Sequence, residues 1–141
     1  MKGQCRCGQL SYEVSAEPVY SLYCHCHACQ NRSSAPCMGF VMVKQQDLKV
    51  VGESQAYKDK GGSGAPIIQH RCSDCGNVVH SDLMVLDGIV ALSSATLEDH
   101  SDFKPNSHCW VSSQHPNFSI NDELPQEQGP PKALFQYIRQ G

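Results

Sequence analysis

Short apolar and β-branched runs alternate with turn-forming residues along most of the chain. Each run holds four to six residues, and Gly, Pro, Asp, Asn or Ser separates it from the next. Strands of this length at this spacing are typical of an all-β domain. We therefore predict strands at Leu10–Val14, Tyr20–Tyr23, Met38–Val43, Leu48–Val51, Ile67–His70, Val78–Ser81 and Ile89–Ser93.

Helical periodicity is nearly absent. The sequence favours short helical turns only at Ala28–Ser34 and Lys132–Ile138. The glycine-rich stretch Lys60–Pro66 is typical of a flexible loop or hairpin tip, and Asn121–Lys132 is polar and proline-rich. We expect one mainly β domain over residues 1–141 with few short helices, and a polar tail from about residue 121 that hugs the surface.

Cysteine usage changes this picture. The chain has 141 residues, of which nine are cysteines. Hydrophobic residues make up only 40% of the chain, and this fraction includes the cysteines. The remaining apolar residues make a thin core, which a covalent or metal staple would support. An odd cysteine count, without a signal-peptide pattern, favours metal binding in a reducing, cytoplasmic compartment over a disulfide framework.

Charge and hydropathy exclude two classes of partner. The net charge is −3, and lysine and arginine never cluster beyond a pair, so a surface that follows nucleic-acid phosphates is disfavoured. No apolar stretch approaches the length of a transmembrane helix, so we expect no membrane partner.

Two cysteine pairs have the spacing of a zinc site. Cys5 and Cys7 form one pair and Cys72 and Cys75 the other, and each pair is followed at once by glycine. Such loops place two sulfurs on one tetrahedral ion, and glycine allows the sharp backbone turn around them. Together the pairs predict a closed, structural four-cysteine zinc site. The alternative is two unrelated pairs of buried or disulfide-linked thiols.

A third cluster, Cys24, Cys26 and Cys29, packs three cysteines into six residues. Three thiolates can hold one face of a zinc tetrahedron, and the loop supplies no obvious fourth. Because catalytic zinc sites keep an open position, we predict a second, open zinc that binds an incoming thiol. The alternative is a second structural zinc, with Cys37, His80, His108 or another distant residue as its fourth ligand.

The other cysteines and histidines carry weaker signals. We expect Cys37 and Cys109 to pack as small hydrophobic residues. His25 and His27 flank predicted ligands, and we expect both to be exposed loop histidines. The alternative is that one of them is itself a ligand of the cluster. No pattern distinguishes the remaining histidines from ordinary surface or strand residues: His70, His100 and His115.

A set of short segments that spans almost the whole chain matches one known family: Gly3–Gly8 with Tyr12 and Val14, Cys24–Cys29, Cys72–Gly76, His108–Trp110 and Leu124–Gln126. With these segments the sequence resembles the family of glutathione-dependent formaldehyde-activating enzymes, which includes centromere protein V. The resemblance implies a β-tent of small antiparallel sheets closed by the four-cysteine zinc and a second zinc on the three-cysteine cluster. It also implies a carbon–sulfur lyase that joins or splits a thiol and an aldehyde.

The sequence departs from the family pattern at a few positions. Gln30 stands where a basic residue is usual, Ser34 replaces a common glycine, and Gln69–Arg71 occupies a typically aromatic stretch. These departures bear on the substrate more than on the metal sites.

Three functional hypotheses follow. The first is a lyase that uses two zinc ions per chain and acts on a small thiol adduct such as S-hydroxymethylglutathione. The second is a zinc-stapled binding module without catalytic activity. The third is a redox or metal-buffering protein, since clustered thiolates can release zinc on oxidation.

Overall fold

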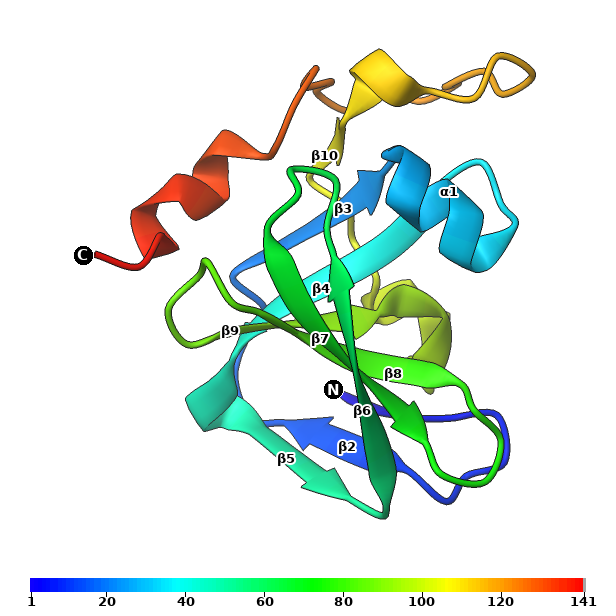
Figure 1. Ribbon diagram of the computed structural model, residues 1–141, viewed down its shortest axis with the longest axis vertical. Helices are drawn as coiled ribbons and strands as arrows, with labels where there is room; N and C mark the ends of the chain where they lie inside the picture. Colours follow the sequence, from blue (N-terminus) through cyan, green and yellow to red (C-terminus); the bar gives the residue numbers. More distant parts are fainter. Residues whose placement is uncertain (141) are drawn as a thin grey trace.

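Two β-sheets form the framework of the computed structural model, which describes residues 1–140 (Figure 1). A three-stranded sheet has the order β1-β2-β5, and a seven-stranded sheet has the order β10-β3-β4-β9-β8-β7-β6. The strands are β1 Lys2–Gln4, β2 Ser11–Val14, β3 Tyr20–Cys24, β4 Met38–Lys44, β5 Leu48–Val51, β6 Ser54–Lys60, β7 Pro66–Cys72, β8 Val78–Leu83, β9 Ile89–Ser93 and β10 Ser107–Cys109.

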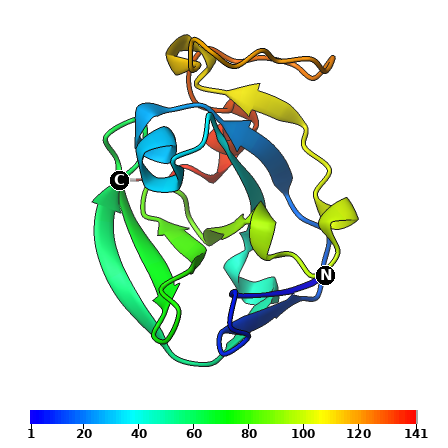
Figure 2. The same ribbon diagram turned by 90° about the vertical axis from the view of Figure 1, so that its right-hand side faces the viewer.

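Neighbouring strands of the large sheet run antiparallel except for β10 and β3, which pair in parallel. The sheet is strongly curved, so that hairpin β6–β7 and strands β3–β10 form opposing walls (Figure 2). The mainly β fold with few short helices confirms the predicted fold class. No helix among residues 1–140 is long and apolar enough to cross a membrane.

All seven predicted strands are present, and three further strands were missed. The most instructive is β6, because all seven of its residues are exposed and its sequence is SQAYKDK. Apolar alternation cannot reveal such a strand. It is held instead by main-chain pairing with β7 along its whole length, from Ser54 opposite Cys72 to Lys60 opposite Pro66.

Helices are accessories, as predicted. The α-helix α1 covers His27–Ser33, one residue earlier than expected. The expected turns near the C-terminus form a 3₁₀ helix at Lys132–Tyr137. The other 3₁₀ segments are Gln45–Asp47, Ser94–Thr96, His100–Asp102 and Val111–Ser113.

The large sheet separates two apolar clusters. In β4, Val41 and Val43 belong to one cluster and Met42 to the other, because successive strand residues point to opposite faces. Strand β9 repeats this alternation with all five residues buried. The first cluster contains Cys5 and Cys72, and the second contains Cys24, Cys26, Cys29, Cys109 and Leu134. The four-cysteine site therefore lies at the edge of the first apolar cluster, and the three-cysteine site lies within the second.

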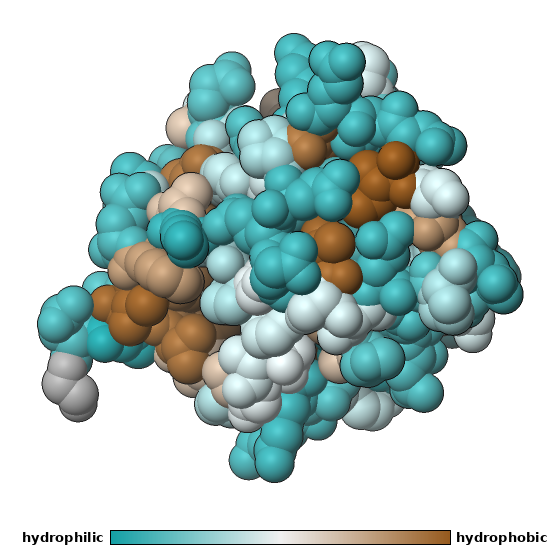
Figure 3. Space-filling view, turned by 90° about the horizontal axis from the view of Figure 1, so that it is seen from above, coloured by the Kyte–Doolittle hydropathy of each residue, from teal (hydrophilic) through white to brown (hydrophobic). Residues whose placement is uncertain are grey.

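The C-terminal segment adds to the second cluster. The polar tail follows β10 through main-chain hydrogen bonds, from His108 N–H to Pro125 O (2.9 Å) and from Glu127 N–H to His108 O (2.9 Å). Beyond the tail, Leu134 is buried while Phe135 and Ile138 are about half exposed. Viewed from above, hydrophobic side chains gather beside this end of the chain (Figure 3).

Candidate metal centres and the adjoining cavity

The structure brings Cys5, Cys7, Cys72 and Cys75 together. Their sulfur atoms all lie within 4.8 Å of one another. Two S–S distances, Cys5 to Cys7 and Cys7 to Cys72, are both 3.6 Å. Sulfurs bound tetrahedrally at about 2.3 Å from zinc would lie about 3.8 Å apart. The arrangement is thus compatible with a zinc ion held by four thiolates, as the spacing predicted.

The backbone around this cluster favours thiolates. The N–H of Leu10 donates to Cys5 Sγ (3.3 Å), and those of Asp74 and Cys75 donate to Cys72 Sγ (3.4 and 3.5 Å). Burial alone would raise the pKa of Cys5. The hydrogen bonds from Leu10 and the neighbouring thiols outweigh that effect and lower the pKa to about 6.

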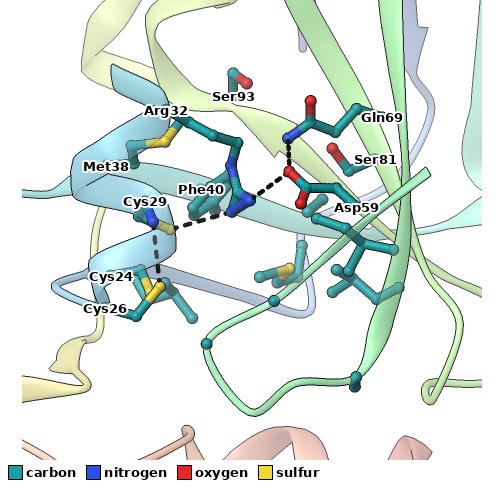
Figure 4. Close-up of a pocket in the computed structure, with 18 of the residues that line it drawn as sticks. Cys24, Cys26, Cys29, Arg32, Met38, Phe40, Asp59, Gln69, Ser81 and Ser93 are labelled. Carbon is teal, nitrogen blue, oxygen red and sulfur yellow. Dashed lines mark hydrogen bonds and ion pairs between the residues drawn. The ribbon is translucent and has the colours of Figure 1, made fainter. Parts of the chain in front are cut away.

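The second cluster lies where β3 ends and α1 begins. Cys24 is the last residue of β3, Cys26 is the N-cap of α1, and Cys29 lies in its first turn. Cys26 Sγ accepts the N–H of Cys29 at 3.3 Å (Figure 4). The three sulfurs lie within 4.8 Å of one another and all three residues are buried. This soft donor set is also compatible with zinc.

The surroundings of the three-cysteine cluster shift the pKa values of its thiols in opposite directions. Hydrogen bonds from Cys24 and Cys29, together with the Cys29 N–H and the charge of Arg32, hold the pKa of Cys26 far below its usual range. Neighbouring thiols raise the pKa of Cys29, with Cys24 exerting the largest effect. Cys26 is therefore the first of the three to become a thiolate.

Cys109 lies beside this cluster, where sequence reasoning placed only a packing residue. It belongs to the apolar cluster as expected, but it also pairs with Cys24 in the parallel register of β10 and β3. Its thiol is the largest influence raising the pKa of Cys24. Among residues 1–140, however, no fourth Cys, His, Asp or Glu donor lies within 4.8 Å of all three sulfurs. The spacing of the chain gave no signal of this fourth thiol, because β10 was not predicted.

Polar side chains continue from Cys29 across to hairpin β6–β7. Arg32 reaches Cys29 Sγ with one nitrogen (Nη2, 3.7 Å) and Asp59 Oδ2 with the other (Nη1, 3.1 Å). Asp59 accepts from Gln69 Nε2 (3.5 Å), and Gln69 Oε1 accepts from Arg71 Nη2 (2.9 Å). Figure 4 shows the contacts from Cys29 through Arg32 and Asp59 to Gln69, which cross between α1 and the hairpin.

The hairpin tip closes over Cys26. A Cβ atom at Gly62 would lie 2.7 Å from Cys26 Cβ and 3.1 Å from Cys26 Sγ. The first distance is shorter than real Cβ contacts allow, so only glycine fits at this position without a shift. The predicted glycine-rich loop is therefore a close cover for the three-cysteine cluster.

A cavity of about 970 Å³ adjoins the cluster. Cys24, Cys26 and Cys29 line it at one side, and the C-terminal 3₁₀ helix contributes Leu134 and Phe135. Apolar residues from β4, β7 and β8 complete much of its wall, among them Met38, Phe40, Ile67 and Leu83. The three-cysteine cluster thus opens on a chamber of substrate size.

His25 corrects one prediction. It was expected to be exposed, but it is fully buried, whereas His27 is exposed as expected. Its Nε2 contacts His108 Nδ1 (2.8 Å), and His108 Nε2 contacts Asp122 (2.9 Å). The His108 hydrogen bond lowers the pKa of Asp122, which is therefore a carboxylate. Because a carboxylate only accepts hydrogen bonds, His108 Nε2 donates to Asp122. On the other side of the pair, His25 Nδ1 is buried with no partner among the described residues.

Two departures from the family pattern have local structural reasons. Gln30 Nε2 donates to His25 O and Ser113 O, both at 2.7 Å, and so ties α1 to the segment after β10. Ser34 is the C-cap of α1 with a φ of 53°, in the left-handed region that glycine adopts most easily. Both residues hold the helix that carries Cys26 and Cys29.

A third group joins His70, His80 and Asp82 on adjacent strands. His70 Nε2 contacts Asp82 Oδ2 at 2.8 Å, and the two imidazole rings are stacked with 14° between their planes. In-plane lone pairs of nearly parallel rings cannot converge on one ion, so this group is a hydrogen-bonded stack. His80 lies here and does not complete the three-cysteine cluster.

The family model for glutathione-dependent formaldehyde-activating enzymes matches residues 1–113 of the chain. The chain belongs to this family. A crystal structure of a Rhodobacter sphaeroides protein has the same fold, with a TM-score of 0.54 and 20% identity over 89% of this chain and 99% of that one. A search of curated proteins gave no significant match. This match confirms the family resemblance that the sequence motifs indicated.

We predict that Gly62→Val weakens metal binding at the three-cysteine cluster by about tenfold, because the added side chain displaces the loop or Cys26. Chelator competition with the cobalt-loaded protein measures this, since sulfur-to-cobalt absorption reports each site. Ser63→Val, which adds a similar side chain at an exposed position of the same loop, is the matched control. Equal effects of the two variants would show that the close approach of Gly62 is unimportant.

We also predict a pH effect from His80. Burial, assisted by His70, lowers its pKa from 6.5 to about 4. Between about pH 6.5 and pH 4, His80 is therefore protonated in the unfolded chain but neutral in the folded chain. The free energy of unfolding falls as the pH falls through this range. Between pH 7 and pH 5, the free energy of unfolding of His80→Leu should fall by about 1 kcal/mol less than that of the wild type. This figure allows for the partial solvent exposure of His80. Urea unfolding at both pH values measures this, and identical pH dependence would contradict it.

Proposed function

We propose that the protein is a zinc-dependent carbon–sulfur lyase that splits or forms a small thiol–aldehyde adduct of the S-hydroxymethylglutathione type. The observation that carries this proposal is the contrast between the two cysteine clusters. One gathers four thiols, a complete tetrahedral set, while the other gathers three and opens on a cavity. Membership of the formaldehyde-activating family supports the same chemistry.

The three thiols and their surroundings suit a metal-held thiolate. A zinc ion bound there would supply Lewis acidity that holds an incoming thiol in its thiolate form at neutral pH. The positive charge of Arg32, 3.7 Å from Cys29 Sγ, offsets part of the negative charge that three or four sulfurs accumulate. The loop around Gly62 covers Cys26 and limits access of bulk water.

The proposed reaction balances without an oxidant or reductant. In the cleavage direction the carbon–sulfur bond breaks and its electron pair stays on sulfur. The adduct's hydroxyl loses its proton as the carbonyl forms, and the released thiolate takes up one proton on leaving. In the synthetic direction the same thiolate attacks the aldehyde carbon.

We further propose a reducing compartment, such as the cytoplasm, as the place of this activity. All nine cysteines are free thiols in the structure. Such clusters stay available for metal only where disulfides do not persist.

The proposal predicts different outcomes for two serine variants. Cys26→Ser should keep the fold, because serine is a good N-cap and its hydroxyl can still accept the Cys29 N–H, but the lyase activity should be lost. Cys75→Ser should lower the free energy of unfolding by about 5 kcal/mol or more, enough to unfold an ordinary domain.

Thermal unfolding, zinc content and adduct turnover followed by NMR make the comparison. If Cys26→Ser unfolds as completely as Cys75→Ser, the three-cysteine cluster is structural and the lyase proposal fails. If it folds with unchanged turnover, the cluster is not the reaction site.

A further inference from the structure

The wall of the cavity is mainly apolar. Aliphatic, aromatic and sulfur-containing side chains line it from β3, β4, β7, β9 and the C-terminal 3₁₀ helix. Several of these residues also form the apolar cluster that contains the three cysteines, so the apolar surface continues up to the sulfur atoms. Prominent members of this wall are Leu22, Met38, Phe40, Met42, Leu134 and Phe135.

Charged groups in the cavity wall are few and mostly committed. The charged lining residues are Arg32, Asp59 and Arg71. Arg32 and Asp59 form an ion pair at 3.1 Å, and Arg32 also faces Cys29. Arg71 stacks over the ring of Tyr57 at 4.4 Å and donates to Gln69. Its buried Nε has no partner among the described residues, and its Nη1 forms no hydrogen bond with them.

The charged residues of the cavity wall do not complement the charges of glutathione. Glutathione carries two carboxylates and an ammonium group, and each buried charge needs a partner of opposite sign. The single positive charge of Arg71 cannot neutralise both carboxylates. An uncharged apolar substituent, in contrast, gains free energy from every methylene group that it buries against this wall.

We infer that the cavity binds the apolar substituent of the thiol, so that the substrate is a thiol–aldehyde adduct bearing an uncharged alkyl or aryl group of several carbons in place of glutathione. The position of the substrate's sulfur rests on the proposed function. The apolar character of its substituent rests on the cavity wall alone. With its sulfur at Cys24, Cys26 and Cys29, such a molecule would extend toward Leu134 and Phe135.

The half-exposed residues at the C-terminal end form the rim through which such a substituent would pass. Phe135 is 47% exposed and Ile138 44% exposed, and both line the cavity. Val85, at 41%, lines it from the turn after β8. Hydrophobic side chains gather at this edge in Figure 3.

Calorimetric titration of the zinc-loaded protein with 1-butanethiol, 1-hexanethiol and glutathione tests the inference. We expect hexanethiol to bind about 15-fold more tightly than butanethiol, since each of its two additional methylenes contributes a factor of about four when buried. Hexanethiol should also bind more tightly than glutathione. Glutathione binding as tightly as hexanethiol, or equal affinity for the two alkyl thiols, would overturn the inference.

A matched pair of variants locates the binding. Phe135→Glu places a charge at the cavity rim, whereas Val51→Glu places one at a similarly exposed apolar position outside the cavity. We expect about a tenfold loss of hexanethiol affinity in the first variant and none in the second. Zinc content confirms that both are folded. Equal loss in both variants, or no loss in either, would contradict the location.

The same titrations separate this inference from the proposed lyase function. Titration with 1-hexanol, which lacks a thiol, measures the cavity without the sulfur chemistry. If hexanol and hexanethiol both bind but no thiol–aldehyde adduct is turned over, the cavity assignment stands and the lyase proposal fails. If glutathione adducts are turned over and neither hexyl compound binds, the lyase proposal stands and the apolar substrate is wrong.

Discussion

Four sulfur atoms join the start of the chain to the turn between β7 and β8, and the rest of the fold depends on this junction. Cys5 and Cys7 come from the turn after β1, whereas Cys72 and Cys75 lie far along the sequence. A metal ion held by these four sulfurs would fix the small sheet against one face of the large sheet, where the apolar cluster includes Cys5 and Cys72. Because the ordinary apolar core is thin, such an ion would add stability that side-chain burial alone would not supply.

The opposite face of the same sheet carries the proposed reactive site. Alternation along β4 and β9 directs every second side chain into the second apolar cluster, where Cys24, Cys26 and Cys29 lie. Cys26 is the N-cap of helix α1, and its sulfur accepts the N–H of Cys29. The turn that starts the helix therefore also places the three thiols at the wall of the cavity. Arg32, one turn further along α1, connects this cluster to Asp59 on hairpin β6–β7. The proposed structural site and the proposed reactive site therefore lie on separate faces of one sheet.

The sequence predicted what local spacing and alternation determine. Both cysteine clusters were found because their members lie within a few residues of one another or in matched pairs. It missed β6, whose exposed polar residues carry no apolar pattern, and β10, whose short run is held by β3 and the tail. The burial of His25 and the position of Cys109 beside Cys24 depend on that missed pairing. The cavity was also beyond prediction, because its wall combines residues from strands that meet only in the folded sheet.

X-ray absorption at the zinc edge tests the central claim, that one cysteine cluster is closed and the other open. We predict two zinc ions per chain, one surrounded by four sulfurs and the other by three sulfurs and a lighter atom. Addition of 1-hexanethiol should raise the number of sulfurs bound to the second zinc ion from three to four. Four sulfurs around both ions before any thiol is added would contradict the account, because Cys109 or another protein thiol would then close the second site.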